Sequence, residues 1–71
     1  MAESVYKVLE LVGTSAVSWE LAAKAAVERA AATLRDLRVA EVVEQDLVIE
    51  AGKVEAYRTK LKVSFKFEGK A

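Results

Sequence analysis

The chain has 71 residues, enough for one small domain, and its 11 basic residues balance its 11 acidic ones. This neutrality argues against a surface field that attracts nucleic acid or anionic membranes. The sequence contains no cysteine and no histidine, which excludes disulfides, thiolate sites and the common zinc sites. A domain this small buries only about 60% of its unfolded surface, so additional stability is expected from self-association or from a metal held by carboxylates and backbone oxygens alone.

The composition is unusually apolar for so short a chain. Hydrophobic residues make up 54% of it, against roughly 45–50% in typical domains, and many are alanine and valine, which suit close subunit contacts. The apolar runs are too short to span a membrane, and the first four residues lack the features of a signal peptide. We therefore expect one domain over residues 1–71, located in the cytoplasm.

Residues 4–12 are rich in β-branched and aromatic types and predict a strand. Apolar side chains fall on both of its faces, as in strands that are covered on both sides. The segment Gly13-Thr14-Ser15 then predicts a turn, with Ser15 as the N-cap of a helix. A glycine before a helix also permits phosphate binding at the helix N-terminus, but the remaining glycines and the lysine of a P-loop are missing, which favours capping.

Residues 16–36 change to helical spacing. One face carries an apolar stripe, mostly alanine, which allows a close approach to whatever covers it: Trp19, Ala22, Ala23, Ala26, Ala30, Leu34 and Leu37. Trp19 falls in the first turn, where an indole either stacks on an aromatic ligand or seals the end of a core or a subunit contact. Packing is the favoured interpretation.

Residues 38–50 and 54–67 predict two long strands joined by a tight Ala51-Gly52 turn. The last strand alternates apolar residues with basic ones and so has one core face and one polar face. The predicted fold is therefore α+β, a β-α-β-β subunit with a three-stranded antiparallel sheet against one helix. Strands this long extend past the helix and leave apolar sheet uncovered, so a second subunit is the expected cover.

The second strand carries a series of carboxylates, which allow two interpretations: Glu41, Glu44, Asp46 and Glu50. They pair with Arg58, Lys60 or Lys62 across the hairpin, or they contribute to a site for a hard cation such as calcium or magnesium. Ion pairing is favoured because no EF-hand-type loop is present. The hydroxyl side chains have no histidine to activate them, so we expect no enzyme.

Four segments, in this order and spacing, resemble the dodecin family. They are Leu11-Val12-Gly13-Thr14-Ser15, the alanine-spaced helix with Ala22, Ala26 and Arg29-Ala30, the run Ala40-Glu41-Val42-Val43-Glu44-Gln45, and Lys62-Val63-Ser64-Phe65. The resemblance extends from Val5 to Glu68. It implies a sheet wrapped partly around one helix and a homododecamer that forms a hollow shell with cubic symmetry.

The resemblance also implies a flavin pocket. Dodecins bind flavins in pairs between subunits and store or quench them without catalysis. Their pocket uses a tryptophan just after the helix, a glutamine on the last strand and, in some members, an acidic residue near the flavin side chain. The matching positions here are Val39, Arg58 and Glu44, so both the aromatic platform and the amide are replaced.

Some members that resemble this chain through Arg38-Val39-Ala40 have a proposed calcium-binding role, which implies Glu41, Glu44 and Asp46 as metal ligands. The leading hypothesis is a non-catalytic, homo-oligomeric shell that binds, stores or buffers a small ligand or ion. The alternatives are flavin binding through a rearranged pocket, calcium binding by the second-strand carboxylates, and a purely structural assembly. No nucleic acid or membrane partner is expected.

Overall fold

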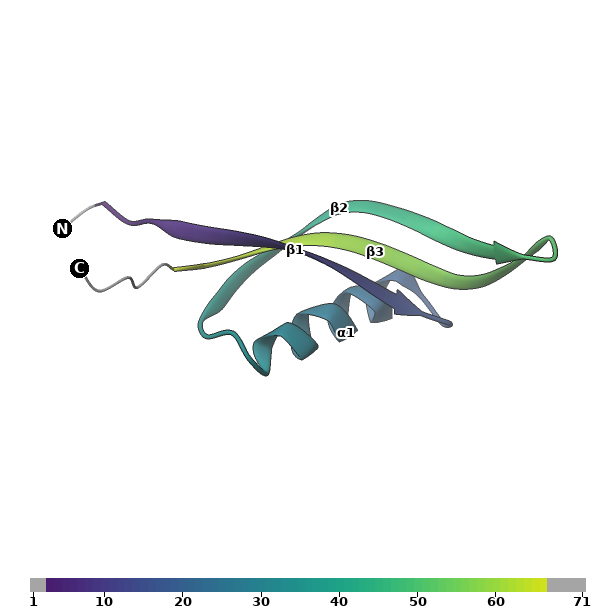
Figure 1. Cartoon of the computed structure of the whole chain (residues 1–71), viewed down its shortest axis with the longest axis horizontal. Helices are drawn as coiled ribbons and strands as arrows, with labels where there is room; N and C mark the ends of the chain where they lie inside the picture. The colour runs from purple at the N-terminus through teal and green to yellow at the C-terminus, as the bar shows by residue number, and fades with distance from the viewer. Residues whose placement is uncertain (1–2, 67–71) are drawn as a thin grey trace.

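A computed structural model describes residues 3–66 of the chain. It contains three strands and one helix in the order β-α-β-β (Figure 1): β1 (Tyr6–Ser15), α1 (Trp19–Ala31), β2 (Leu37–Glu50) and β3 (Lys53–Lys66). This order confirms the predicted α+β fold. Phe67, which was expected to end the last strand, lies outside the described residues.

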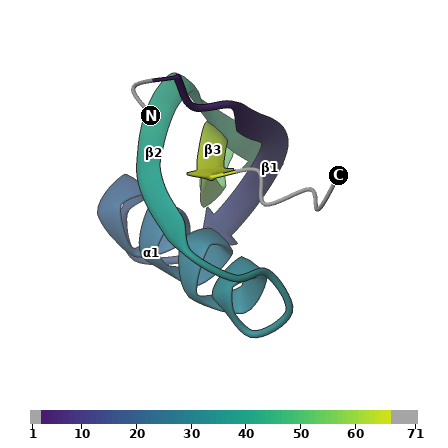
Figure 2. The same ribbon diagram turned by 90° about the vertical axis from the view of Figure 1, so that its left-hand side faces the viewer.

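The strands form one antiparallel sheet in the order β1-β3-β2. The last strand in the sequence is therefore the central one, with hydrogen-bonded neighbours on both sides. Figure 2, a view along the long axis, shows that the sheet curves and that α1 lies across one of its faces. The three-stranded antiparallel sheet against one helix is thus as predicted.

The core lies between α1 and the middle of β3. Leu61, Val63 and Thr59 are almost completely buried there, and Ala22 and Ala30 meet them from the helix. These three β3 residues alternate along the strand, so they share the face toward α1. The helix packs mainly over β1 and β3 and barely touches β2, which leaves the helix-side face of β2 largely uncovered.

Gly13 belongs to β1, where it lies opposite Thr59, and the turn predicted at Gly13-Thr14-Ser15 is wrong. The reason is the close approach of α1. A Cβ on Gly13 would collide with the carbonyl group of Ala22 and press on the Ala26 methyl group. Glycine on the strand and alanine on the helix therefore let the two backbones pack closely.

The helix is shorter than predicted at both ends, and its N-cap is Ser18 rather than Ser15. The Ser18 hydroxyl accepts a hydrogen bond from the Leu21 amide at 3.1 Å, the usual N-cap bond to the third helical residue. Ser15 instead accepts from the Val17 amide at 3.0 Å and so turns the chain before the helix. Near the C-terminal end of α1, the Thr33 hydroxyl donates a hydrogen bond to the carbonyl of Ala30. The regular backbone hydrogen bonds of the helix end there.

The β2–β3 hairpin turns at Ala51-Gly52, as predicted. Both residues have positive φ, 51° and 76°, as a two-residue turn that matches the strand twist requires. The β1–β3 register is unbroken, whereas β2 shifts register against β3 at three places, one of them between Val42 and Glu44.

The folded chain is elongated, with extents of 55 × 20 × 16 Å. The hairpin continues past the N-terminal end of α1 as an arm, and β1 begins and β3 ends at the opposite end (Figure 1). No helix among residues 3–66 is long and apolar enough to cross a membrane.

Candidate functional site

The sheet face that points away from α1 carries most of the residues predicted to have a function. We call it the outer face. It is identified by alternation: Arg58, Lys60 and Lys62 alternate with the buried β3 residues Thr59, Leu61 and Val63 and therefore point the other way. Their cross-strand neighbours share this face, and those on β2 are Asp46, Glu44 and Glu41.

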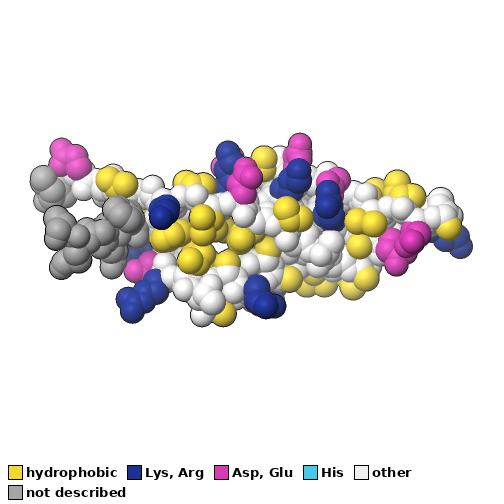
Figure 3. All heavy atoms as spheres, in the orientation of Figure 1, with side chains coloured by type: hydrophobic (Ala, Val, Ile, Leu, Met, Phe, Trp, Pro, Cys, Tyr) yellow, Lys and Arg dark blue, Asp and Glu magenta, His cyan; other side chains and the backbone are white. Residues whose placement is uncertain are grey.

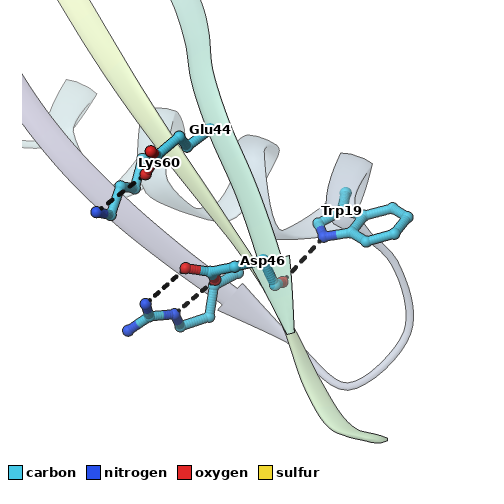
Figure 4. A network of polar contacts seen from close by, with 5 residues as sticks. Trp19, Glu44, Asp46 and Lys60 are labelled. Carbon is cyan, nitrogen blue, oxygen red and sulfur yellow. Dashed lines mark hydrogen bonds and ion pairs between the residues drawn. The ribbon is translucent and has the colours of Figure 1, made fainter. Parts of the chain in front are cut away.

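Asp46 and Arg58 form the best-defined ion pair on the outer face. Arg58 donates from Nε to Oδ1 at 2.8 Å and from Nη2 to Oδ2 at 2.7 Å, a two-pronged contact (Figure 4). The hydrogen bond from Arg58 holds the pKa of Asp46 below its ordinary value, and partial desolvation opposes this only in part. The same bond raises the pKa of Arg58, so both groups stay charged over the physiological range.

The next pair along the hairpin is Glu44 and Lys60, with 3.2 Å between Oε1 and Nζ. Glu41 lies opposite Lys62 in the register, without an ion pair within 4.0 Å. The three carboxylates proposed as metal ligands thus lie on one face, each opposite a basic residue. This confirms the cross-strand pairing interpretation for two of them.

A single copy of the chain does not gather these carboxylates around one point. Within residues 3–66, no three acidic side chains lie close enough together to hold a metal ion. Any cation site built from Glu41, Glu44 or Asp46 therefore needs further ligands from water or from another copy of the chain, because calcium takes six to eight oxygens.

Val39 lies on the outer face opposite Ser64, at the other end of the hairpin from Arg58. Ser64 is six positions after Arg58 on β3, or about 20 Å along the strand. One small ligand cannot span that distance within a subunit. Val39 is 61% exposed and borders a depression of about 200 Å³ between α1 and the start of β2 that is lined mostly by aliphatic side chains.

A larger groove of about 480 Å³ lies beside the Glu44–Lys60 pair. It is lined by one acidic and two aliphatic residues of β1, two residues at the β2 register shift and two of β3: Glu10, Leu11, Val12, Val43, Glu44, Lys60 and Leu61. Its volume lies within the range of small-molecule sites. Of the three positions matched to the family flavin pocket, only Glu44 lines it.

Trp19 joins the start of α1 to the hairpin, in a way the sequence did not predict. Its indole Nε1–H donates to the carbonyl of Asp46 at 3.1 Å (Figure 4), and its ring meets Tyr57 edge-on with centroids 5.2 Å apart. This confirms packing rather than an open stacking position. The acceptor is a backbone group 27 residues away, so no side-chain pattern could have indicated it.

Comparison with known proteins places these features in one family. The dodecin family model matches residues 5–68. The calcium dodecin of Mycobacterium tuberculosis is 56% identical over 64 residues, 89% of each chain. The dodecin of Thermus thermophilus is 48% identical over 65 residues, 90% of this chain and 93% of its own. Neither name describes an enzyme.

Solved structures agree with the sequence comparison. Streptomyces coelicolor dodecin is similar with a TM-score of 0.90 at 38% identity, over 99% of this chain and all of its own. The M. tuberculosis calcium dodecin, described as calcium-chelating with a calcium-binding site, has a TM-score of 0.82 at 51% identity, over 96% of this chain and 97% of its own. The β-α-β-β topology, the helix held against the sheet at Gly13 and the matched sequence together show that this chain belongs to the dodecin family.

Proposed function

We propose that the chain is the subunit of a non-catalytic homododecameric shell that binds and buffers a small ligand or ion. The observation that carries the assembly is excess surface. A folded monomer of this mass exposes about 4,300 Å², whereas this subunit exposes 5545 Å². Its radius of gyration is 14.9 Å, against about 11 Å for a compact chain of this length.

The exposed surface is also apolar. Thirteen large hydrophobic side chains of the described residues are exposed, whereas four hydrophobic residues are buried. Figure 3 shows hydrophobic side chains gathered where the sheet meets the helix and further along the hairpin arm. On the helix side of β2, Val42 is 49% and Leu47 40% exposed, and α1 contacts β2 far less than it contacts β1 and β3. Such a surface is typical of subunit interfaces.

Light scattering coupled to size exclusion tests the assembly. Twelve subunits of 7.7 kDa give a particle of about 92 kDa. A monomer or dimer at micromolar concentration would contradict the proposal, since a shell held by hydrophobic interfaces should persist at that dilution.

For the ligand, we infer that a divalent cation fits the outer face better than a flavin. Glu41, Glu44 and Asp46 supply oxygen ligands of the kind that calcium prefers, and the relative with 56% identity is a calcium dodecin. A symmetry-related copy is the proposed source of the remaining ligands. By contrast, Val39 offers no aromatic face for a flavin. Arg58 binds both carboxylate oxygens of Asp46, so Asp46 has to exchange these bonds to bind the cation, whereas Glu41 is not engaged in an ion pair within 4.0 Å.

Calorimetry with calcium on the assembled, chelator-treated protein tests the cation. Saturable heat together with a higher melting temperature in calcium is the expected result. The matched variants Glu44→Gln and Glu55→Gln distinguish the outer face from general acidity, because only the first should weaken binding. If neither heat nor stabilisation is observed, the proposal that the chain binds a divalent cation is contradicted.

Retained flavin binding is tested separately by adding the protein to a flavin and following its fluorescence. Strong quenching at micromolar protein would favour a rearranged pocket at Val39 and Arg58 over the cation. If both titrations are silent and the purified particle is colourless and free of metal, the purely structural assembly is the better description.

A further inference from the structure

Trp19 is bonded to both strands of the hairpin from a single position at the start of α1. Its indole donates to the Asp46 carbonyl of β2, and its ring rests against Tyr57 of β3. Its own carbonyl accepts a hydrogen bond from the Thr59 hydroxyl at 3.0 Å, and Thr59 is completely buried. One helical residue therefore holds adjacent segments of β2 and β3 in place.

Asp46 is consequently held at two points. The indole binds its backbone carbonyl, and Arg58 binds its carboxylate with two hydrogen bonds, one to each oxygen (Figure 4). A two-pronged arginine contact demands a particular orientation of the carboxylate plane, so a small movement of the backbone weakens it. No such requirement applies to Glu44 and Lys60, where the lysine acts as a point charge.

We propose that Trp19 is a positioning residue for the Asp46–Arg58 pair, and that its fluorescence reports the state of that pair. The inference deepens the proposed function. It rests on the proposed function at one point, which is that Asp46 and Arg58 belong to the candidate site. The coupling runs from the indole through the Asp46 backbone to the outer face. Trp19 is the only tryptophan in the chain, so the emission has a single source.

The first test is Trp19→Phe, which keeps an aromatic ring for Tyr57 but removes the N–H donor. Protein labelled with ¹⁵N-arginine gives a side-chain Nε–H signal for Arg58, assigned by its loss in Arg58→Lys. We expect solvent exchange of this proton to become several-fold faster in the folded, assembled variant. The control Tyr57→Phe keeps both the ring contact and the indole bond and should leave exchange unchanged. Unaltered exchange in Trp19→Phe would overturn the proposal.

The second test keeps Trp19 and changes the pair, so it does not depend on the folding of the first variant. Asp46→Asn and Glu44→Gln each remove one negative charge from β2, two residues apart. We expect a shift in Trp19 emission or quantum yield for Asp46→Asn and the wild-type spectrum for Glu44→Gln. Equal spectra in both variants would refute the coupling.

These tests separate the inference from the proposed function. If calcium gives no heat but Trp19 still distinguishes the two variants, the ion site fails and the coupling stands. If calcium binds and the two variants have equal spectra, the coupling fails and the ion site stands. Calcium binding at Asp46 itself should also change Trp19 emission, with a midpoint that matches the calorimetric one.

Discussion

At the scale of single residues, the Asp46–Arg58 pair is the best-defined ion pair of the outer face. Arginine occupies the position that the family resemblance assigns to a glutamine, and the neighbouring strand supplies an aspartate that holds it. The pair is partly exposed, with 39% of each side chain accessible, so solvent screens much of its energy. Its main effect is to hold the Asp46 carboxylate and the Arg58 guanidinium in fixed orientations.

The lowered pKa of Asp46 predicts a contribution to stability that depends on pH. Because the folded-state value lies below the ordinary 3.8, the contribution is present above that pH and is lost as the pH falls through the lower, folded value. Asp46→Asn should therefore reduce the loss of stability between neutral pH and about pH 3. Urea midpoints of wild type and variant at the two pH values measure this, and equal losses would contradict it.

The role of Gly13 depends on the close approach of α1 to β1. Gly13→Ala should destabilise the fold by at least about 1–3 kcal/mol, the usual cost of an overpacked core, because the new methyl group meets the rigid Ala22 backbone. Chemical denaturation measures the change. Thr14→Ala is the control, since Thr14 is exposed and its loss should cost no more than about 0.5 kcal/mol. Equal effects would show that α1 does not depend on the glycine.

At the scale of elements, the sequence predicted the number, type and order of the helix and strands. Hydrophobic spacing carries that information, and the boundaries of β2 and β3 agreed to within one residue wherever they are described. The errors lie at the ends of β1 and at both ends of α1, which is shorter than the predicted 16–36. Gly13 has the composition of a turn, but its use in a close strand–helix contact depends on tertiary packing.

The candidate site was predictable to a smaller extent. Alternation along the strands placed the acidic and basic residues opposite one another, and two of the expected ion pairs are present. The register shift between Val42 and Glu44, which gives the groove one of its walls, has no sequence signature because a β-bulge depends on the partner strand. The hydrogen bond from the Trp19 indole to the Asp46 carbonyl could not be predicted either, because it also depends on which distant segments the fold brings together.

The hairpin turn offers a test of element stability. Ala51 has a φ of 51°, a conformation that costs an ordinary residue about 1–2 kcal/mol and asparagine less. Ala51→Asn should raise the free energy of unfolding by about 1 kcal/mol, whereas the β-branched variant Ala51→Val should lower it. Urea denaturation of the three proteins gives the order, and a more stable valine variant would contradict the turn assignment.

At the scale of the whole molecule, the helix covers two strands of a three-stranded sheet. The apolar side of β2 is left largely uncovered within one chain. It is the surface that the proposed assembly is expected to bury. The folded chain is thin and elongated, so its own helix and sheet do not fold over this surface. Neighbouring copies can cover it with surface of the same kind.

Val42→Glu tests that surface directly. Val42 lies opposite the buried Leu61 but is itself 49% exposed, and a carboxylate there would be buried without a partner in an interface. We expect dissociation into smaller species at micromolar concentration by light scattering. Val17→Glu introduces the same charge in the loop before α1, at a side chain that is 69% exposed, and should remain assembled. An intact particle for Val42→Glu would place the interface elsewhere.

The position of β3 has a consequence for how the chain folds during synthesis. The strand that pairs with both neighbours and carries most of the core is the last of the three strands to be synthesised. Until it leaves the ribosome, β1 and β2 have no partner strand and α1 has no completed surface to pack on. The sheet therefore cannot form before β3 has been synthesised, and folding waits for contacts that are distant in the sequence.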